Sequence, residues 1–268
     1  MENQDTFINS ASKPVIGEGY AGKRIIEAIE NNELLLLYQL IDPLNINSSE
    51  CRHYEVFVRL IEEEDNLMPP GAFFPLAEKH GLMPSLDRWV VKHVLGWVSG
   101  RHLQGILDEG SMFFINLAGA TIRDLKFPGF VQKSLQERHM AGATLCFEIP
   151  GGDLTLSVAE IARFAKAIRE IGCSVAIIGF GQGMTLFGKI SGFQVDFLKI
   201  DGSIILNMHR EPEKLAKTVA ISQVAKKIGV KTIAEFVENE ETITKLREIG
   251  VDFVQGFGVS RPIALERY

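Results

Sequence analysis

Polar and ionisable side chains stand at or near the C-terminal ends of several apolar runs in this sequence. They are Glu55 and Arg59, Asn116, Glu148, Lys199 and Asp201, Glu235, and Gln255. Carboxylates, amides and amines brought together in this way can hold a divalent cation or grip an anionic ligand. One such residue alone is more often a solvated loop residue or a helix cap. Their recurrence at corresponding positions favours a single shared site.

The apolar residues between these positions switch repeatedly between a period of two and a period near 3.6. We expect strands over residues 34–41, 53–60, 111–117, 144–149, 173–178, 195–200, 231–234 and 252–255. We expect helices over residues 22–31, 74–81, 85–100, 128–137, 157–171, 213–228 and 240–249, with Ser85 capping the third. This alternation predicts a TIM-like (β/α) barrel, in which the strand ends share one mouth. A doubly wound sheet is the alternative.

Composition limits the class of protein. The 268-residue chain has a formal net charge of −6 with interspersed charges, so we expect no binding of a DNA or RNA duplex. Residues 1–19 are polar and predict a linker, whereas residues 20–268 form the predicted barrel. No apolar run reaches the roughly 20 residues that span a bilayer, and the N-terminus lacks a secretion signal. We therefore expect a cytoplasmic protein without membrane insertion.

Several other residue types are interpreted as structural. Cys51, Cys146 and Cys173 lack the spacing of a disulfide framework and are expected to be reduced core thiols. The six histidines show no metal-binding spacing. Trp89 and Trp97 lie on one predicted helix and are interpreted as core anchors, and residues 63–65 as a solvated charge run.

The stretch VAIIGFGQG, residues 175–183, breaks from an apolar run into a glycine-rich loop. Loops after barrel strands usually carry catalytic side chains, yet this one has no ionisable group. It could be a site without chemistry, a phosphate cradle, or a catalytic site that has lost its acids. A nicotinamide or flavin enzyme is one alternative, although Met184 stands where its third glycine would be expected.

Longer motifs give a specific resemblance. They are YQLI at 38–41, EVFVR at 55–59, FFPLAEKHGLMPSLDRWVV at 73–91, FINLAG at 114–119, CFEI at 146–149, LKID at 198–201, TIAEFVE at 232–238 and QGF at 255–257. In this order they resemble the EAL domain family of cyclic di-GMP phosphodiesterases, from about Lys23 to Pro262. The resemblance implies a barrel whose mouth holds two divalent metals, usually Mg²⁺ or Mn²⁺.

The metal ligands implied by the resemblance are incomplete in this sequence. Glu55, Asn116 and Glu148 match, but the paired aspartates of active members are replaced by Ile178 and Gly179. A two-metal centre needs enough oxygen ligands to hold both cations and activate water. We therefore expect a catalytically inactive domain that requires no metal, with Glu55, Asn116 and Glu148 as vestigial ligands. The alternative is a weakly active phosphodiesterase in which Asp196 or Asp201 replaces the missing pair.

The residues that would bind the nucleotide are retained. The positions implied by the resemblance are Gln39, Glu55, Phe57, Val58, Arg59, Asp87, Asn116, Glu235, Phe236, Gln255, Gly256, Phe257 and Pro262. Arg59 could grip a phosphate, and Asp87 could accept from guanine N1 and N2. Phe236, which replaces a usual glycine, could stack on a base or fill the core.

The replaced aspartate pair, together with EVF at 55–57 and AEFVE at 234–238, is similar to the degenerate receptors of this family. That resemblance implies a cyclic di-GMP receptor without hydrolysis. It also implies control of type IV pilus biogenesis and twitching motility, with a PilZ-type adaptor as partner.

Overall fold

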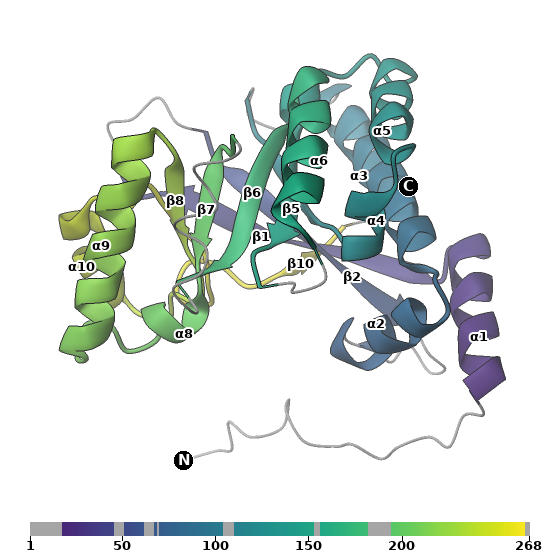
Figure 1. The fold of residues 1–268 in the computed structure, drawn as a ribbon. Coiled ribbons are helices and arrows are strands. Elements are labelled where there is room, and N and C mark those ends of the chain that lie inside the picture. Colours follow the sequence, from purple (N-terminus) through teal and green to yellow (C-terminus); the bar gives the residue numbers. More distant parts are fainter. Residues whose placement is uncertain are drawn as a thin grey trace.

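A closed barrel of eight strands forms the centre of the molecule (Figure 1). The computed structural model describes residues 18–45, 51–61, 67–68, 70–103, 110–152, 156–181 and 194–265. The barrel strands are β1 (Leu34–Pro43), β2 (His53–Ile61), β4 (Phe113–Asn116), β5 (Leu145–Pro150), β6 (Ser174–Phe180), β7 (Phe197–Ile200), β8 (Lys231–Ala234) and β9 (Phe253–Val254). Their order around the barrel is β1-β9-β8-β7-β6-β5-β4-β2, and β2 pairs with β1 to close it.

One strand of the barrel runs against the others. β1 is antiparallel to β2 and β9, whereas the pairs from β2 through β9 are parallel. Two short strands extend the edges, namely β3 (Leu67–Met68) beside β2 and β10 (Ile263–Ala264) beside β1. The predicted TIM-like barrel is therefore confirmed, with a mixed rather than fully parallel sheet.

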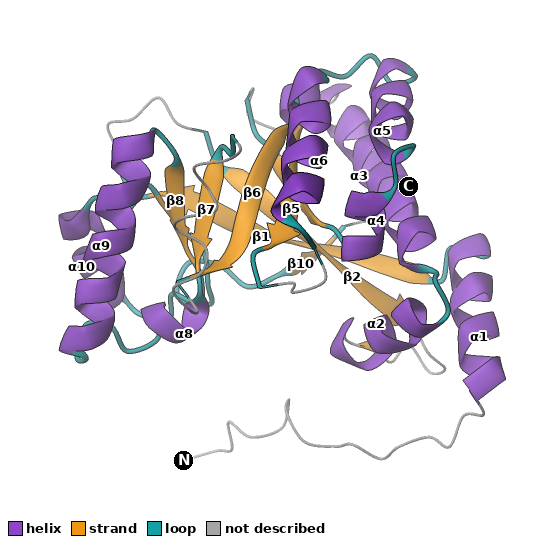
Figure 2. Cartoon of the chain, in the orientation of Figure 1, coloured by secondary structure: helices purple, strands orange, loops and turns teal. Residues whose placement is uncertain are grey.

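Helices cover the outside of the barrel (Figure 2). They are α1 (Glu18–Glu30), α2 (Pro70–Lys79), α3 (Met83–Leu103), α4 (Gly119–Arg123), α5 (Phe127–Gln136), α6 (Val158–Glu170), α8 (Gly202–Ile205), α9 (Pro212–Ile228) and α10 (Glu240–Ile249), with a 3₁₀ turn, η2, at Gly142–Thr144. In Figure 1, α9 and α10 lie beside β7 and β8, and α3 to α6 gather at the opposite side. None of the helices in the described ranges is long and apolar enough to cross a membrane.

Local capping explains several helix ends. Ser157 accepts from the Glu160 backbone and Glu160 reaches back to Ser157, a capping box that starts α6. α9 ends at Gly229 with φ of +72°, a conformation that glycine adopts without steric cost. The prediction for Ser85 was wrong, because α3 begins at Met83 and Ser85 lies inside its first turn. The predicted linker lies almost entirely outside the described residues, and α1 already begins at Glu18.

Two apolar layers form the core. The larger lies between the barrel and its helices, and the smaller fills the barrel interior. We call the interior layer the barrel floor; its members are Ile41, Phe114, Cys146, Ala176, Phe197, Ile233 and Phe253. Cys146 and Cys173 are buried, as predicted, and burial raises the pKa of Cys173 to about 12, whereas Cys51 is only half-buried, so the prediction of a core thiol was wrong there. The floor closes the barrel beneath the strand C-terminal ends.

Candidate functional site

One residue in, or directly after, each barrel strand stands next to the barrel floor, on the side where the seven parallel strands have their C-terminal ends. Side chains alternate between the two faces of a strand, so the residue two positions after a floor residue points to the same face, toward the mouth. In β1, which runs the opposite way, the corresponding residue comes two positions before the floor residue. For β2 the corresponding residue below is His53, whose ring lies against Phe114, Phe197 and Phe253. We call this set the mouth ring: Gln39, Glu55, Asn116, Glu148, Ile178, Lys199, Glu235 and Gln255. Seven members are polar and one, Ile178, is aliphatic.

Lys199 is the central cation of the mouth ring. Its Nζ lies 2.6 Å from Glu55 Oε2, 2.9 Å from Glu148 Oε1 and 3.1 Å from Glu235 Oε1, and its side chain is fully buried. Burial alone would lower the pKa of Lys199, but the three carboxylates raise it well above the usual value. The lysine is therefore held charged. The sequence pattern placed Lys199 at this mouth without assigning it a role.

Glu55 is the most fully hydrogen-bonded carboxylate of the ring. Asn116 Nδ2 donates to its Oε1 at 2.7 Å, and Gln255 Nε2 donates to its Oε2 at 2.6 Å, beside the Lys199 ammonium. Burial works against ionisation, yet these partners outweigh it and lower the pKa of Glu55. Gln255 also donates to Gln39 Oε1 at 3.2 Å, and Gln39 Nε2 donates to the Ser260 carbonyl at 2.8 Å. The ring is thus a continuous polar network.

Glu148 has a different environment. Its two carboxyl oxygens are buried: Oε1 lies 2.9 Å from the Lys199 ammonium, and Oε2 has no hydrogen-bond partner among the described residues. Burial and repulsion from Glu55 raise the pKa of Glu148 well above its usual value. Burial, with repulsion from Glu55, also raises the pKa of Glu235. Ionisation is therefore favoured most at Glu55.

These residues do not fit a two-metal centre. Both Glu55 oxygens already accept hydrogen bonds, and Asn116 presents its amide nitrogen to Glu55. Among the described residues, Glu148 Oε2 and Gln255 Oε1 are buried ring oxygens without a hydrogen-bond partner, whereas Glu148 Oε1 faces the Lys199 ammonium at 2.9 Å. Within the described residues, no group of three or more His, Cys, Asp or Glu side chains is arranged to hold a metal ion. The Lys199 ammonium supplies the positive charge at the centre of the ring.

Ile178 and Gly179, which replace the paired aspartates, belong to strand β6 and not to the loop that follows it. β6 runs to Phe180 through a register shift between Ile177 and Phe180, so the predicted strand end at Ile178 was too early. Gly179 lies in this bulge with φ of +71°, and a Cβ there would stand 3.9 Å from Asp201 Oδ2. Gln182 and Gly183 of the same loop lie outside the described residues.

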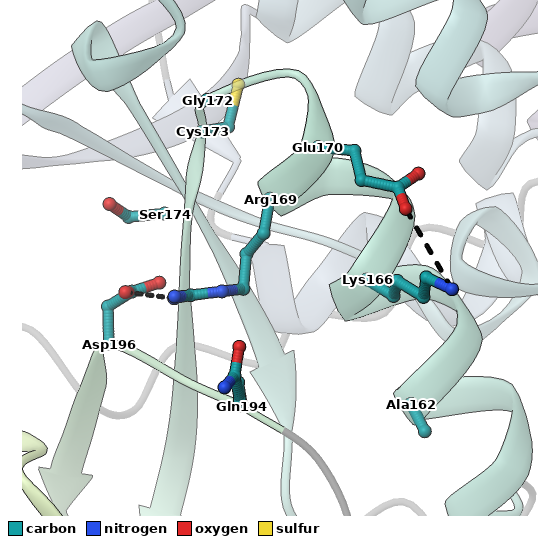
Figure 3. A pocket seen from close by; sticks show the side chains of 9 residues that line it. All are labelled: Ala162, Lys166, Arg169, Glu170, Gly172, Cys173, Ser174, Gln194 and Asp196. Carbon is teal, nitrogen blue, oxygen red and sulfur yellow. Dashed lines mark hydrogen bonds and ion pairs between the residues drawn. The ribbon is translucent and has the colours of Figure 1, made fainter.

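The two aspartates considered as substitutes lie at opposite ends of the barrel. Asp196 precedes β7, at the opposite end of the barrel, where it pairs with Arg169 and accepts from the Val175 backbone at 2.9 Å. Figure 3 shows Arg169 extended from α6 toward Asp196 in a pocket at that end. Asp201 follows β7 but caps α8, accepting from the Ser203 backbone at 2.9 Å. The expectation that Asp196 could replace a missing ligand was wrong.

The far end of β2 carries the predicted phosphate-binding arginine. β2 extends beyond the last residue that it pairs with on β4, so Phe57 and Arg59 project past the mouth ring on the same face as Glu55. The Arg59 guanidinium lies 5.9 Å from the Phe57 ring centroid, and its Nη1 donates to the Val58 carbonyl at 2.9 Å. Partial burial lowers the pKa of Arg59. The Val58 side chain instead packs in the outer core, so only its backbone faces this region.

Two exposed aromatic rings flank the mouth at the ends of β8 and β9. Phe236 is 65% exposed with φ of +54°, and Phe257 is 63% exposed beneath the Arg261 guanidinium, 5.2 Å from its centroid. The Phe236 ring covers Gly202, where a Cβ would stand 2.2 Å from Phe236 Cδ2. The alternative that Phe236 fills the core was wrong, because its ring lies at the surface.

The polypeptide backbone is tight beside these rings. A Cβ at Gly256 would lie 2.2 Å from the Val237 carbonyl oxygen, so glycine permits a close approach of two chain segments. Pro262 is half-buried just before β10. Gly256 follows Gln255 of the mouth ring, and Pro262 precedes β10, which pairs with β1. Neither residue carries an ionisable group.

Asp87 lies on α3 and is only 4% exposed. Its Oδ2 accepts from the Ala118 backbone at 3.1 Å and from Thr121 Oγ1 at 2.5 Å, at the start of α4. Burial raises the pKa of Asp87 to about 7. Part of its hydrogen-bonding capacity is therefore used to fix α4, and its contact with guanine stays a prediction.

Comparisons with known proteins agree with this architecture. The EAL domain model matches residues 23–262. The cyclic di-GMP phosphodiesterase PdeB of Shewanella oneidensis is 33% identical over 245 residues, which cover 91% of this chain and 28% of that protein. The chain spans about a third of the length of such relatives.

Two solved structures share the fold closely. The FimX EAL domain from Pseudomonas aeruginosa, bound to c-di-GMP, gives a TM-score of 0.84 at 23% identity, over 92% of this chain and 98% of that one. The Xanthomonas citri FimX EAL domain, in complex with c-diGMP, gives 0.84 at 25% identity, over 94% and 96%. With the family model covering most of its length, the chain belongs to the EAL domain family.

Proposed function

We propose that this domain binds cyclic di-GMP at the mouth of the barrel and does not hydrolyse it. The observation that carries the proposal is the mouth ring itself, in which Lys199 contacts all three carboxylates and Ile178 supplies no ligand. Hydrolysis by two metals needs several free carboxylate oxygens, whereas a receptor needs only contacts to the intact nucleotide. The likeness to the two FimX EAL domains bound to c-di-GMP supports the choice of ligand.

The surroundings of the mouth ring suit a bis-phosphate with two flat bases. Arg59 supplies a guanidinium that can bind a phosphate through two charge-assisted hydrogen bonds. Phe236 and Phe257 present exposed faces on which a base can stack, worth about 1–3 kcal/mol per base. We propose that Gln39, Glu55, Asn116, Glu235, Gln255, Gly256 and Pro262 line the same site.

Calorimetric titration with cyclic di-GMP, in EDTA and again with Mg²⁺, tests the proposal directly. We expect saturable binding of equal strength in both conditions, because both Glu55 oxygens already accept hydrogen bonds and Ile178 supplies no metal ligand. Chromatography of the nucleotide recovered after incubation with Mg²⁺ should show it intact. Steady conversion to the linear dinucleotide, or binding only with Mg²⁺, would contradict the receptor proposal.

Substitution of Arg59 tests the phosphate contact. Arg59→Ala should weaken cyclic di-GMP binding by about 1.5–3 kcal/mol, the range for a hydrogen bond to a charged group. Arg52→Ala is a matched control, because Arg52 precedes the same strand at its other end and pairs with Asp42. An unchanged dissociation constant for Arg59→Ala would remove Arg59 from the site.

We further propose that the domain reports cyclic di-GMP to a protein partner in the cytoplasm. Its FimX-like fold and its retained EVF and AEFVE motifs support a role in type IV pilus biogenesis and twitching motility through a PilZ-type adaptor. Co-elution of the domain with a purified PilZ-type adaptor on size exclusion, with and without cyclic di-GMP, tests this. No ligand-dependent complex would restrict the proposal to nucleotide binding.

A weakly active metal-dependent phosphodiesterase is the second candidate. Glu148 Oε2, which has no hydrogen-bond partner among the described residues, favours it, as do relatives named phosphodiesterases, such as PdeB. The same chromatography separates the candidates, since slow turnover that Glu148→Gln abolishes would establish the second.

A further inference from the structure

A groove on the outside of the barrel is distinct from the mouth ring. It has a volume of about 620 Å³ and runs between α3 and the first residues of β1, with Leu34, Leu36 and Leu265 among its apolar lining. One stripe of α3 forms its wall: Trp89, Lys92, His93, Gly96, Trp97 and Gly100. These positions recur at three- and four-residue intervals and share one helix face. Volumes of this size are typical of small-molecule sites.

The charged groups of the groove have one sign. Lys92, His93 and Arg138 line it, and no acidic side chain does so among the described residues. A Cβ at Gly96 would stand 3.7 Å from Arg138 Nη2, so the guanidinium lies along α3, where glycine leaves space. Burial, Arg138 and Lys92 together lower the pKa of His93. The cations therefore lie close enough to repel one another in a protein whose net charge is negative.

The hydrogen bonds of His93 favour its charged form. Its Nδ1 lies 2.8 Å from the Trp89 carbonyl oxygen, and its Nε2 lies 3.1 Å from Asn32 Oδ1. Trp89 Nε1 also donates to Asn32 Oδ1, at 3.2 Å, which fixes the amide with its oxygen toward the histidine. Both ring nitrogens thus face acceptors, and a neutral imidazole can donate to only one. An anion in the groove would remove this conflict by offsetting the repulsion from Arg138 and Lys92.

We propose that this groove binds a small anionic ligand with a flat apolar body, namely an aryl phosphate or an aryl carboxylate. The anion lies between Arg138, Lys92 and His93, where the guanidinium can form charge-assisted bonds. The ring lies against the tryptophans and the leucines of β1. The first residues of β1 line the groove, and Gln39 of the mouth ring lies further along the same strand.

Intrinsic fluorescence is a specific probe of this groove, because the chain contains two tryptophans and both line it. Phenyl phosphate and benzoate should each produce a saturable change in tryptophan emission. Benzyl alcohol, which lacks the charge, and inorganic phosphate, which lacks the ring, should bind at least about tenfold more weakly. Equal responses to phenyl phosphate and benzyl alcohol would overturn the proposal, as would no saturable response to either anion.

Variants locate the site. Arg138→Gln should weaken phenyl phosphate binding about tenfold or more, and Lys92→Gln, at an exposed position of α3, should weaken it without affecting folding. Lys133→Gln is the control, since Lys133 is exposed on α5 and pairs with Glu137. Undiminished affinity in both groove variants would contradict the assignment. Saturating cyclic di-GMP should leave the response unchanged, so the result is independent of the mouth ring.

Discussion

Lys199 shows how one buried side chain can set the charge of a whole site. It contacts three carboxylates within 3.1 Å and is fully buried. Paired charges at such depth are tolerated because each satisfies the other, and removal of one partner leaves an uncompensated charge. The mouth ring is therefore organised around a buried cation.

Replacement of Lys199 tests this organisation. Lys199→Met should lower the free energy of unfolding by about 3–5 kcal/mol, because Glu55 would stay buried without its main counter-charge. Lys217→Met, which breaks an exposed pair with Glu213 on α9, should change stability little. Urea unfolding at pH 7 measures both. A small loss for Lys199→Met would show that the carboxylates can relax or take up protons without it.

Substitutions of Phe236 test whether its side chain contributes to ligand affinity and whether its backbone conformation affects stability. Phe236→Ala and Phe236→Gly should each lose about 1–3 kcal/mol of cyclic di-GMP affinity if the exposed ring stacks on a base. The glycine variant should be more stable than the alanine variant by about 1 kcal/mol, because the site requires φ of +54°. Calorimetry and thermal melting give the two quantities. Unchanged affinity in both variants would exclude stacking.

At the scale of elements, α3 is the helix that joins the parts of the molecule described here. One face carries the groove residues Trp89 to Gly100, and another carries Asp87, which fixes the start of α4 after β4. α4 has only five residues and no side-chain cap of its own. Its position after Asn116 therefore depends on a carboxyl supplied by a neighbouring helix.

Asp87→Asn tests this link. The pKa of Asp87 is raised from 3.8 to about 7, so the folded state binds more protons than the unfolded state between these values. Wild-type stability from this group is fully present below pH 3.8 and is lost as pH rises through 7, by up to about 4 kcal/mol. Asparagine keeps an acceptor for Ala118 and Thr121 without the charge. The variant should therefore gain stability relative to wild type between pH 5 and pH 9.

Urea unfolding at the two pH values measures that gain. Asp42→Asn, in a surface pair with Arg52, is the control and should differ from wild type by the same amount at both. A constant difference for Asp87→Asn as well would show that Asp87 is ionised throughout.

At the scale of the whole molecule, His53 at the barrel floor makes the free energy of unfolding depend on pH in the direction opposite to Asp87. His53 is 4% exposed among the floor aromatics, and its Nδ1 accepts from the Met112 backbone at 3.3 Å. Burial, with Lys231 nearby, lowers the pKa of His53 to about 4. The barrel must therefore open, or bury a charge, before this histidine is protonated.

His53 should make the protein sensitive to acid. The unfolded state binds the extra proton below pH 6.5, so the stability from neutral His53 is present above pH 6.5 and lost as pH falls toward 4, by about 3 kcal/mol. Asp87 changes the free energy of unfolding in the opposite direction with pH, but it does so equally in wild type and in His53→Gln. The difference in free energy of unfolding between these two proteins therefore reports His53 alone. That difference should shrink from pH 7 to pH 4.5. His139→Gln, at an exposed site, should show no such trend.

Local patterns predicted much of this protein. The alternation of periods fixed the barrel and most element positions, and polar residues at strand ends predicted one shared mouth, because strand direction alone brings those ends together. The exchange of the paired aspartates for Ile178 and Gly179 is visible in the sequence and needs no structure. The short elements α4, α8, β3 and β10 were not predicted, since so few residues carry no measurable period.

Other properties depend on which segments meet in space. Lys199 became the centre of the mouth ring only when three other strands placed three carboxylates around it. Asp87 accepts a hydrogen bond from Thr121 of α4, and the exposed Phe236 ring covers Gly202. His93 contacts Asn32 and lines a groove together with Arg138. A residue's type and spacing determine its face on an element. Its partners, burial and pKa are set by contacts between residues tens to hundreds of positions apart, which only the tertiary structure decides.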